Sequence, residues 1–110
     1  METYLGDVEL DSLTSKASLV MIDISSQWCG PCKQLVPILE DIEKSLDSSK
    51  VKFVKIDATN GAPKFVMDLG IKMVPALLFY KNGKLMVKEN GLKSKQQILD
   101  IIEGLTNGKE

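Results

Sequence analysis

One short run of apolar residues constrains the fold of this chain more than any other feature. Residues 19–24 read Leu-Val-Met-Ile-Asp-Ile, so Asp23 is the only polar residue in the run. A strand with one face in water alternates apolar and polar residues, whereas a strand covered on both faces is apolar nearly throughout. The run therefore predicts an inner strand of a sheet that is covered on both faces.

The pattern becomes helical soon after this strand. From Pro31 to about Asp47, apolar residues recur at spacings of three and four, which predicts an amphipathic helix. Farther along, residues 51–57 (VKFVKID) predict a second strand. Residues 60–69 predict a short helix, with Gly70 as its stop.

The last third of the chain predicts a hairpin and a closing helix. Asn82-Gly83 stands between two strand-like runs, residues 75–80 and 85–88, and an Asn-Gly pair in that place is a strong hairpin signal. Ser94 and Gln97 have the spacing of a capping box, which opens the final helix. The core face of this helix is expected to be Ile98, Ile101, Ile102 and Leu105.

These elements predict an α/β fold with a mixed sheet, in which the early strands are parallel and the last two antiparallel. No repeat, linker or low-complexity tract interrupts the chain, so we expect one domain over residues 1–110. A chain of 110 residues is long enough to bury a single hydrophobic core.

Composition excludes several classes of function. The 14 basic and 15 acidic residues nearly cancel, so we expect neither nucleic acid nor a membrane surface as a partner. The chain has no histidine, which removes Ser-His and Cys-His dyads and histidine-ligated metal sites. Two cysteines alone do not complete a zinc site, so no metal is expected.

The location expected from the sequence is the cytoplasm. Residues 1–7 lack the basic and apolar regions of a signal peptide, and the longest apolar runs are too short to span a bilayer. In a reducing compartment a cysteine pair is more often redox-active or metal-binding than structural. Redox chemistry is therefore the leading interpretation.

The two cysteines stand between the inner strand and the helix, in the segment Trp28-Cys29-Gly30-Pro31-Cys32. Free backbone N–H groups and the helix dipole favour a thiolate at a helix N-terminus. Cys32, one turn on, is close enough to form a disulfide with Cys29. Pro31 suits the first turn, and Gly30 keeps the first sulfur open to approach. An incidental pair of half-buried cysteines is the alternative, and this placement argues against it.

The segment WCGPC resembles the active-site motif of the thioredoxin family. The resemblance covers nearly the whole chain, and its further landmarks are the strand at residues 19–23, Pro37, Lys55, Asp57, Pro75, Asn82-Gly83 and Gly91. It implies the thioredoxin fold, a five-stranded mixed β-sheet flanked by four α-helices.

The resemblance also implies a function. It is that of a thiol–disulfide oxidoreductase, a protein-disulfide reductase that works through the redox-active disulfide Cys29–Cys32. Its partners would be disulfide-containing target proteins and, as electron donor, thioredoxin reductase, an NADPH-dependent flavoprotein. No bound cofactor is implied, because the cysteines carry the two electrons. The resemblance further implies roles in electron transport and cell redox homeostasis. It also implies that the protein is a monomer.

Two more catalytic residues follow from the resemblance. Asp23 matches the family's buried aspartate, which exchanges protons with the second cysteine. The alternative is a structural carboxylate that accepts hydrogen bonds from the backbone or from water, since a buried charge is costly without a partner. Lys55 matches the family lysine near that aspartate, and the alternative is a solvated lysine on a strand.

The remaining site residues are expected to bind the target. Pro75 matches the family's cis-proline, which presents the backbone of Val74 to an incoming peptide. The alternative is an ordinary trans-proline at the start of an edge strand. The uncharged rim is expected to contain Trp28, Gly30, Pro31 and Gly91 in addition to Val74 and Pro75.

The chain departs from the family pattern near this rim. Ile24-Ser25-Ser26 replaces Phe-Trp-Ala, Ala76 replaces a threonine, and Met73 stands where a small residue is common. Two other functions remain open at this point. One is a disulfide isomerase or oxidant with the same fold, and the other is a binding subunit in which redox chemistry is incidental.

Overall fold

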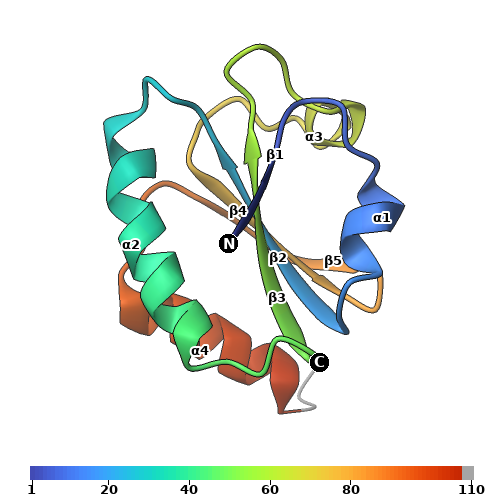
Figure 1. Ribbon diagram of the computed structural model, residues 1–110, viewed down its shortest axis with the longest axis vertical. Coiled ribbons are helices and arrows are strands. Elements are labelled where there is room, and N and C mark those ends of the chain that lie inside the picture. The colour runs from blue at the N-terminus through green and yellow to red at the C-terminus, as the bar shows by residue number, and fades with distance from the viewer. Residues whose placement is uncertain (108–110) are drawn as a thin grey trace.

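A computed structural model describes residues 1–107 as a mixed sheet with helices on both sides (Figure 1). The strand order across the sheet is β1-β3-β2-β4-β5. The strands are β1 (Glu2–Tyr4), β2 (Leu19–Ser25), β3 (Val51–Asp57), β4 (Ala76–Lys81) and β5 (Lys84–Asn90). The helices are α1 (Leu10–Thr14), α2 (Gly30–Lys44), α3 (Lys64–Asp68) and α4 (Lys95–Thr106).

Strand β2 lies at the centre of the sheet, as its apolar run predicted. It pairs in parallel with β3 and antiparallel with β4. Strand β1 adds to β3 in parallel, and β5 adds to β4 antiparallel. The predicted order of parallel and then antiparallel strands is therefore confirmed, and so is the five-stranded mixed sheet with four helices.

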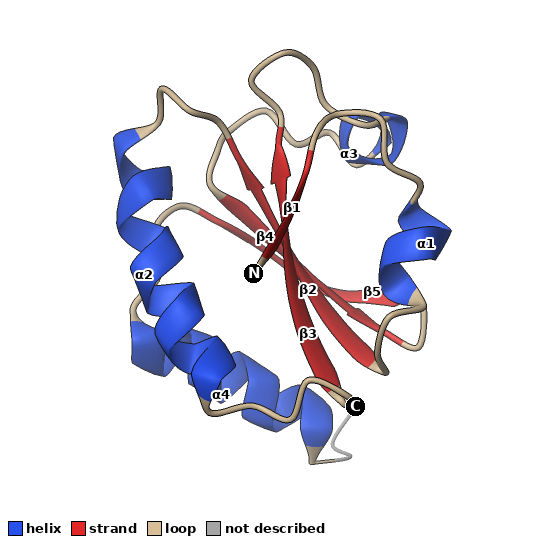
Figure 2. Cartoon of the chain, viewed as in Figure 1, coloured by secondary structure: helices blue, strands red, loops and turns tan. Residues whose placement is uncertain are grey.

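The two faces of β2 contribute to two separate cores. Leu19 and Met21 pack on the side of α2 and α4, whereas Val20, Ile22 and Ile24 pack on the side of α1 and α3. Figure 2 shows the two pairs of helices on opposite sides of the sheet. A strand enclosed in this way has to be apolar at successive positions, which explains the run at residues 19–24.

Local signals determine where the long helices begin. Helix α2 starts directly after Cys29, which is its N-cap, and Pro31 lies in its first turn. The capping box of α4 is present: Gln97 N–H donates to Ser94 Oγ over 3.1 Å, and Ser94 N–H donates to Gln97 Oε1 over 2.8 Å. In the hairpin, Asn82 and Gly83 both adopt positive φ, which the β4–β5 turn requires.

Two expectations from the sequence differ from the structure, and two short elements had no signal in the residue patterns. The short helix expected over residues 60–69 begins only at Lys64, because Gly61 has a φ of 131° and Pro63 is the N-cap. Ile101 is only partly buried, whereas Ile98, Ile102 and Leu105 belong to the core. Residue patterns did not indicate β1 or α1, which are short and in which Leu13 is the one buried residue.

Within residues 1–107 no helix combines the length and apolar character needed to cross a membrane.

The loops after β1 and β3 approach closely at two glycines, which gives a test of the fold. A Cβ added to Gly6 would lie 2.5 Å from the carbonyl oxygen of Gly61. We therefore expect Gly6→Ala to lower the free energy of unfolding by about 1–3 kcal/mol, the usual cost of overpacking. Gly104→Ala is the matched control, since a Cβ there meets nothing within 4 Å in α4. It should raise stability by about 0.5–1 kcal/mol. Urea unfolding measures both, and equal effects at the two glycines would contradict this packing.

Candidate active site

Cys29 and Cys32 form a disulfide at the N-terminus of α2, with their Cα atoms 5.2 Å apart. Strand β2 ends at Ser25, and a short turn carries the chain from there to Cys29. The two cysteines are unequal in exposure: Cys29 is half-buried, whereas Cys32 is 2% exposed. A partner therefore meets Cys29 first.

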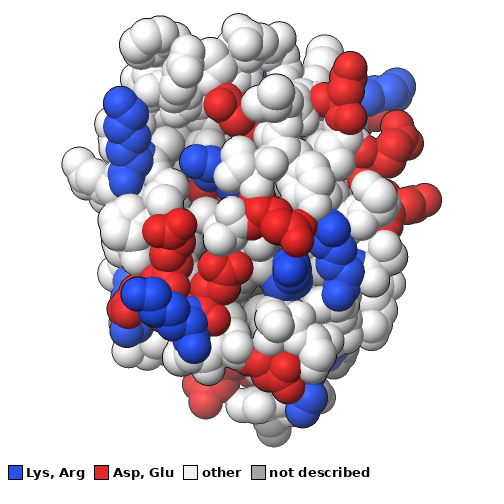
Figure 3. Space-filling view, viewed as in Figure 1, with Lys and Arg blue, Asp and Glu red and all other residues white. Residues whose placement is uncertain are grey.

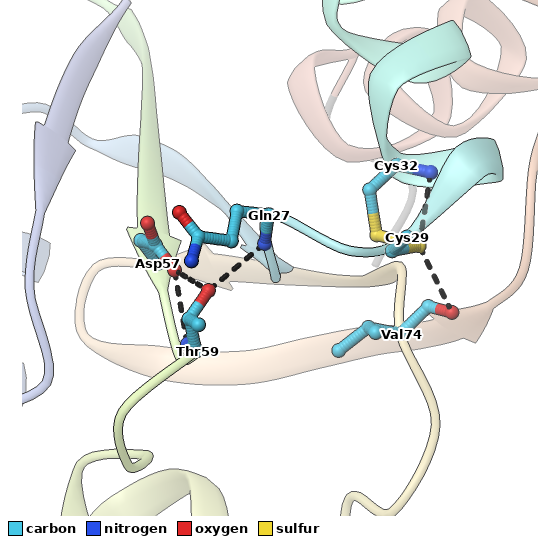
Figure 4. The surroundings of a disulfide bond; sticks show 6 residues. All are labelled: Gln27, Cys29, Cys32, Asp57, Thr59 and Val74. Atoms are coloured by element: carbon cyan, nitrogen blue, oxygen red, sulfur yellow. Dashed lines mark hydrogen bonds between the residues drawn. A yellow bond between two sulfur atoms is a disulfide. The ribbon is translucent and has the colours of Figure 1, made fainter.

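The backbone of α2 is directed at the sulfur of Cys29. As N-cap, Cys29 has extended backbone angles, and its Sγ accepts a hydrogen bond from Cys32 N–H over 3.1 Å (Figure 4). The first turn of α2 contains no acidic residue to oppose a negative charge there. The same donor that contacts the disulfide sulfur can stabilise a thiolate in the reduced protein.

Val74, in the loop before β4, lies against the disulfide, and Pro75 follows it in the chain. The peptide bond between Val74 and Pro75 is cis, as expected from the sequence. The carbonyl oxygen of Val74 lies 3.7 Å from Cys29 Sγ. This is a contact in the oxidised protein, and only the thiol of the reduced form can donate across it. Gly91, with a φ of 85°, donates its N–H to Pro75 O over 2.8 Å, so Gly91 and Pro75 are held side by side.

The surroundings of the disulfide are exposed and rich in apolar side chains. Trp28 is 83% exposed and Met73 is 67% exposed. Gly30 and Pro31 are also exposed, whereas Pro75 is buried and Val74 is half-buried. In Figure 3 the top left of the molecule, where the loop before α2 lies in Figure 1, is uncharged, with a basic side chain below it at the left edge. Exposed apolar area next to a reactive group is typical of a binding surface.

Asp23 is fully buried in β2, opposite Lys55 on β3. Among the described residues, neither of its carboxylate oxygens has a hydrogen-bond partner. Burial raises the pKa of Asp23 to about 7, and the charge of Lys55 offsets only part of that effect. Desolvation is therefore the larger of the two effects, as expected for an acid enclosed by a core.

A cavity of about 220 Å³ lies beside Cys32. Its lining includes Lys55 and Asp57 from β3 and Ser25, Ser26 and Gln27 from the segment before α2. Cys32 and Lys55 thus share one cavity, which Asp23 does not line. Ser25 and Ser26, which depart from the family pattern, form part of the wall of this cavity. A larger cavity of about 310 Å³, between the loops after β1 and β3, touches neither cysteine.

Residue patterns did not identify the hydrogen bonds at the end of β3. Thr59 donates both its N–H and its hydroxyl to Asp57 Oδ1, and Gln27 N–H donates to Thr59 Oγ1 (Figure 4). An Asp followed two residues later by Thr is a local turn signal that could have indicated the first part. The link to Gln27 joins residues 32 positions apart and has no local signal. In residues 1–107 no group of three or more Cys, Asp or Glu side chains is arranged to hold a metal ion.

Comparison with known proteins agrees with this geometry. The family model for thioredoxin matches residues 4–104. A thioredoxin from Rickettsia prowazekii is 40% identical over 83 residues, which are 76% of this chain and 77% of that protein. A thioredoxin from Chlamydia muridarum is 35% identical over 92 residues, 84% of this chain and 85% of its own.

Two solved structures with the same fold are also thioredoxins. A mutant thioredoxin from Halobacterium salinarum superposes with a TM-score of 0.82 at 28% identity, covering 96% of this chain and 91% of that one. A reduced thioredoxin from Schistosoma mansoni gives a TM-score of 0.76 at 28% identity, covering 94% and 97%. The chain therefore belongs to the thioredoxin family, and Cys29 and Cys32 are the redox pair of a thiol–disulfide oxidoreductase that acts on proteins.

Proposed function

We propose that this chain acts as a reductant of protein disulfides in the cytoplasm. It would work as a monomeric, single thioredoxin domain over residues 1–110 and receive electrons from thioredoxin reductase, an NADPH-dependent flavoprotein. Electron transport and cell redox homeostasis are then its cellular roles. The observation that carries the proposal is the asymmetry of the pair: Cys29 is accessible and its Sγ accepts the Cys32 N–H, whereas Cys32 is buried.

The reaction is two successive thiol–disulfide exchanges. The Cys29 thiolate attacks one sulfur of the target disulfide and forms a mixed disulfide, and the other target sulfur leaves as a thiolate. Cys32 then loses its proton and attacks Cys29 Sγ, which releases the second target sulfur. The target gains two electrons and two protons, and the chain keeps the Cys29–Cys32 disulfide until the reductase returns it to the dithiol.

Asp23 is the proposed proton acceptor for Cys32. A carboxylate with a pKa of about 7 can both take and return a proton near neutral pH. Lys55 is proposed to tune this group, because its charge lowers the pKa of Asp23 and its side chain lines the cavity beside Cys32. Neither residue is proposed to touch the target.

The target is proposed to bind as an extended segment against Val74. Its backbone would pair with that of Val74, and its side chains would meet the uncharged rim. The residues of this rim are Trp28, Gly30, Pro31 and Gly91, together with Pro75, which is buried. Apolar contact and backbone hydrogen bonds would therefore determine affinity more than charge.

Reduction of insulin in the presence of dithiothreitol tests the proposal directly. A reductant accelerates the appearance of turbidity from the precipitating B chain, and Cys29→Ser should remove this acceleration. A protein that only binds partners through the surface at Trp28 would leave the rate at that of dithiothreitol alone. That result would favour the binding-subunit interpretation.

The two cysteines should give opposite results when replaced. Cys32→Ser is expected to accumulate mixed disulfides with targets, because the attack that resolves them is lost. Cys29→Ser should accumulate none, since the buried Cys32 does not meet the target first. Non-reducing gels of each variant incubated with insulin give the comparison. Equal trapping by both variants would contradict the assignment of roles.

Asp23 should make the stability of the protein depend on pH. Its pKa is about 7 in the folded state against 3.8 ordinarily, so the folded state binds the proton more tightly. Stability from this group is therefore full below about pH 4 and is lost as the pH rises to about 7. Asp23→Asn removes the ionisable group and should raise the free energy of unfolding at pH 8 by about 2–4 kcal/mol, with little gain at pH 4.

Urea unfolding at pH 4, 6 and 8 measures this difference. The control is Asp100→Asn on the exposed face of α4, and the effect of Asp23→Asn is read relative to this variant at each pH. A gain for Asp23→Asn that is the same at all three pH values would contradict the buried, protonated carboxyl.

The same substitution should slow the second exchange. Without a base, Cys32 has to lose its proton to solvent, and general-base help is typically worth about 10²–10⁴-fold. We expect a loss of at most about 100-fold for Asp23→Asn, because water substitutes in part. The loss should be greatest near pH 7–8, since Asp23 is itself protonated at lower pH. Stopped-flow kinetics of mixed-disulfide resolution from pH 5.5 to 9 measure it, and equal rates throughout would make Asp23 a structural residue.

A further inference from the structure

A side chain at the end of β3 holds the turn that carries the redox pair. Residues 26–29 lead from the end of β2 to the N-cap of α2. Within this turn, Gln27 N–H donates to Thr59 Oγ1 over 2.8 Å. The hydroxyl of Thr59 in turn donates to Asp57 Oδ1, and Thr59 N–H donates to the same oxygen over 2.9 Å (Figure 4). One hydroxyl therefore connects the turn to the carboxylate of Asp57.

The direction of these hydrogen bonds follows from the groups involved. A hydroxyl has one proton to donate, a backbone N–H can only donate, and an ionised carboxylate can only accept. Thr59 must therefore donate to Asp57 and accept from Gln27. The hydroxyl of Thr59, and then its N–H, lower the pKa of Asp57, so this carboxylate stays ionised at neutral pH. The donors and acceptors of these hydrogen bonds can therefore be assigned in only one way.

Few other hydrogen bonds attach residues 26–28 to the rest of the molecule, whereas Cys29, at the end of the turn, is held by its disulfide to Cys32 and by Lys33 N–H, which donates to Cys29 O over 3.2 Å. Ala58 N–H donates to Ser25 O over 2.8 Å, but that bond lies at the end of the sheet, before the turn begins. Cys29 N–H donates to Ser26 O over 3.4 Å, which is a long bond within the turn. Among the described hydrogen bonds of residues 26–28, the one from Gln27 to Thr59 is the link to another segment.

We propose that Thr59 is a positioning residue for the redox pair. Its hydroxyl fixes Gln27, and thereby sets the direction of Trp28 and the placement of Cys29 Sγ against the N–H of Cys32. Thr59 touches neither sulfur and no target. Its effect on target reduction rests on the proposed function, whereas its effect on the turn does not.

The test compares Thr59→Val with Thr59→Ser. Valine has nearly the shape of threonine, but its side chain neither donates to Asp57 nor accepts from Gln27, whereas serine keeps the hydroxyl. The backbone N–H of residue 59 can still donate to Asp57 in both variants, so the comparison isolates the hydroxyl. The chain has one tryptophan, Trp28, so its fluorescence reports on this turn alone. We expect the anisotropy of Trp28 to fall in Thr59→Val and to stay at the wild-type value in Thr59→Ser. Thr59→Ala replaces the valine variant if urea unfolding finds that the latter does not fold.

The reactivity of Cys29 gives a second readout. In the reduced protein, alkylation of Cys29 by iodoacetamide at pH 7 should be about twofold to tenfold slower in Thr59→Val, the factor that one neutral hydrogen bond is worth. The value of kcat/KM for insulin reduction should fall by a similar factor, and Thr59→Ser should restore both. A folded Thr59→Val protein with unchanged anisotropy and unchanged alkylation would overturn the proposal, as would a serine variant that is impaired as much as the valine variant.

These readouts separate the two proposals. If the wild-type protein fails to reduce insulin, the proposed function is wrong. The anisotropy of Trp28 and the alkylation of Cys29 still test the role of Thr59, because neither requires turnover.

Discussion

The hydrogen bond from Cys32 N–H to Cys29 Sγ places a backbone donor on the more accessible sulfur, and the elements around it fix where this sulfur lies. Strand β2 is enclosed on both faces and hydrogen-bonded on both edges, so its end is a rigid point from which α2 starts. The N-terminus of α2 then supplies a free N–H directed at the sulfur. The enclosed strand thus supports the point from which the two cysteines are placed unequally, with Cys29 half-buried and Cys32 buried.

Asp23 lowers the stability of the folded protein. A carboxylate inside an enclosed strand opposes folding when it is ionised, and Lys55 compensates only partly. Strand β2 would be more stable with an apolar residue there. A buried acid that titrates near neutral pH is useful where a proton has to move, and the same desolvation that destabilises it brings its pKa to that range.

Much of this structure could be predicted from residue patterns, for physical reasons that differ between elements. Strand β3 was predicted with its observed bounds, and the capping box of Ser94 and Gln97 marked the start of α4, because each signal is local in sequence. Residue patterns did not predict strand β1 and helix α1, because these short segments bury few side chains. The bond between Gln27 and Thr59 could not be predicted, since it depends on how the ends of two neighbouring strands meet in space.

The reduction potential of the Cys29–Cys32 pair tests the central claim, that this site is a reductant, most directly. Equilibration of the protein with glutathione buffers of known ratio, followed by quantification of the two redox forms, gives the value. Because the chain belongs to the thioredoxin family, the account predicts a potential near the reference value of about −270 mV for thioredoxin itself. A potential near about −120 mV, typical of a disulfide oxidant whose reduced form is strongly stabilised, would contradict it.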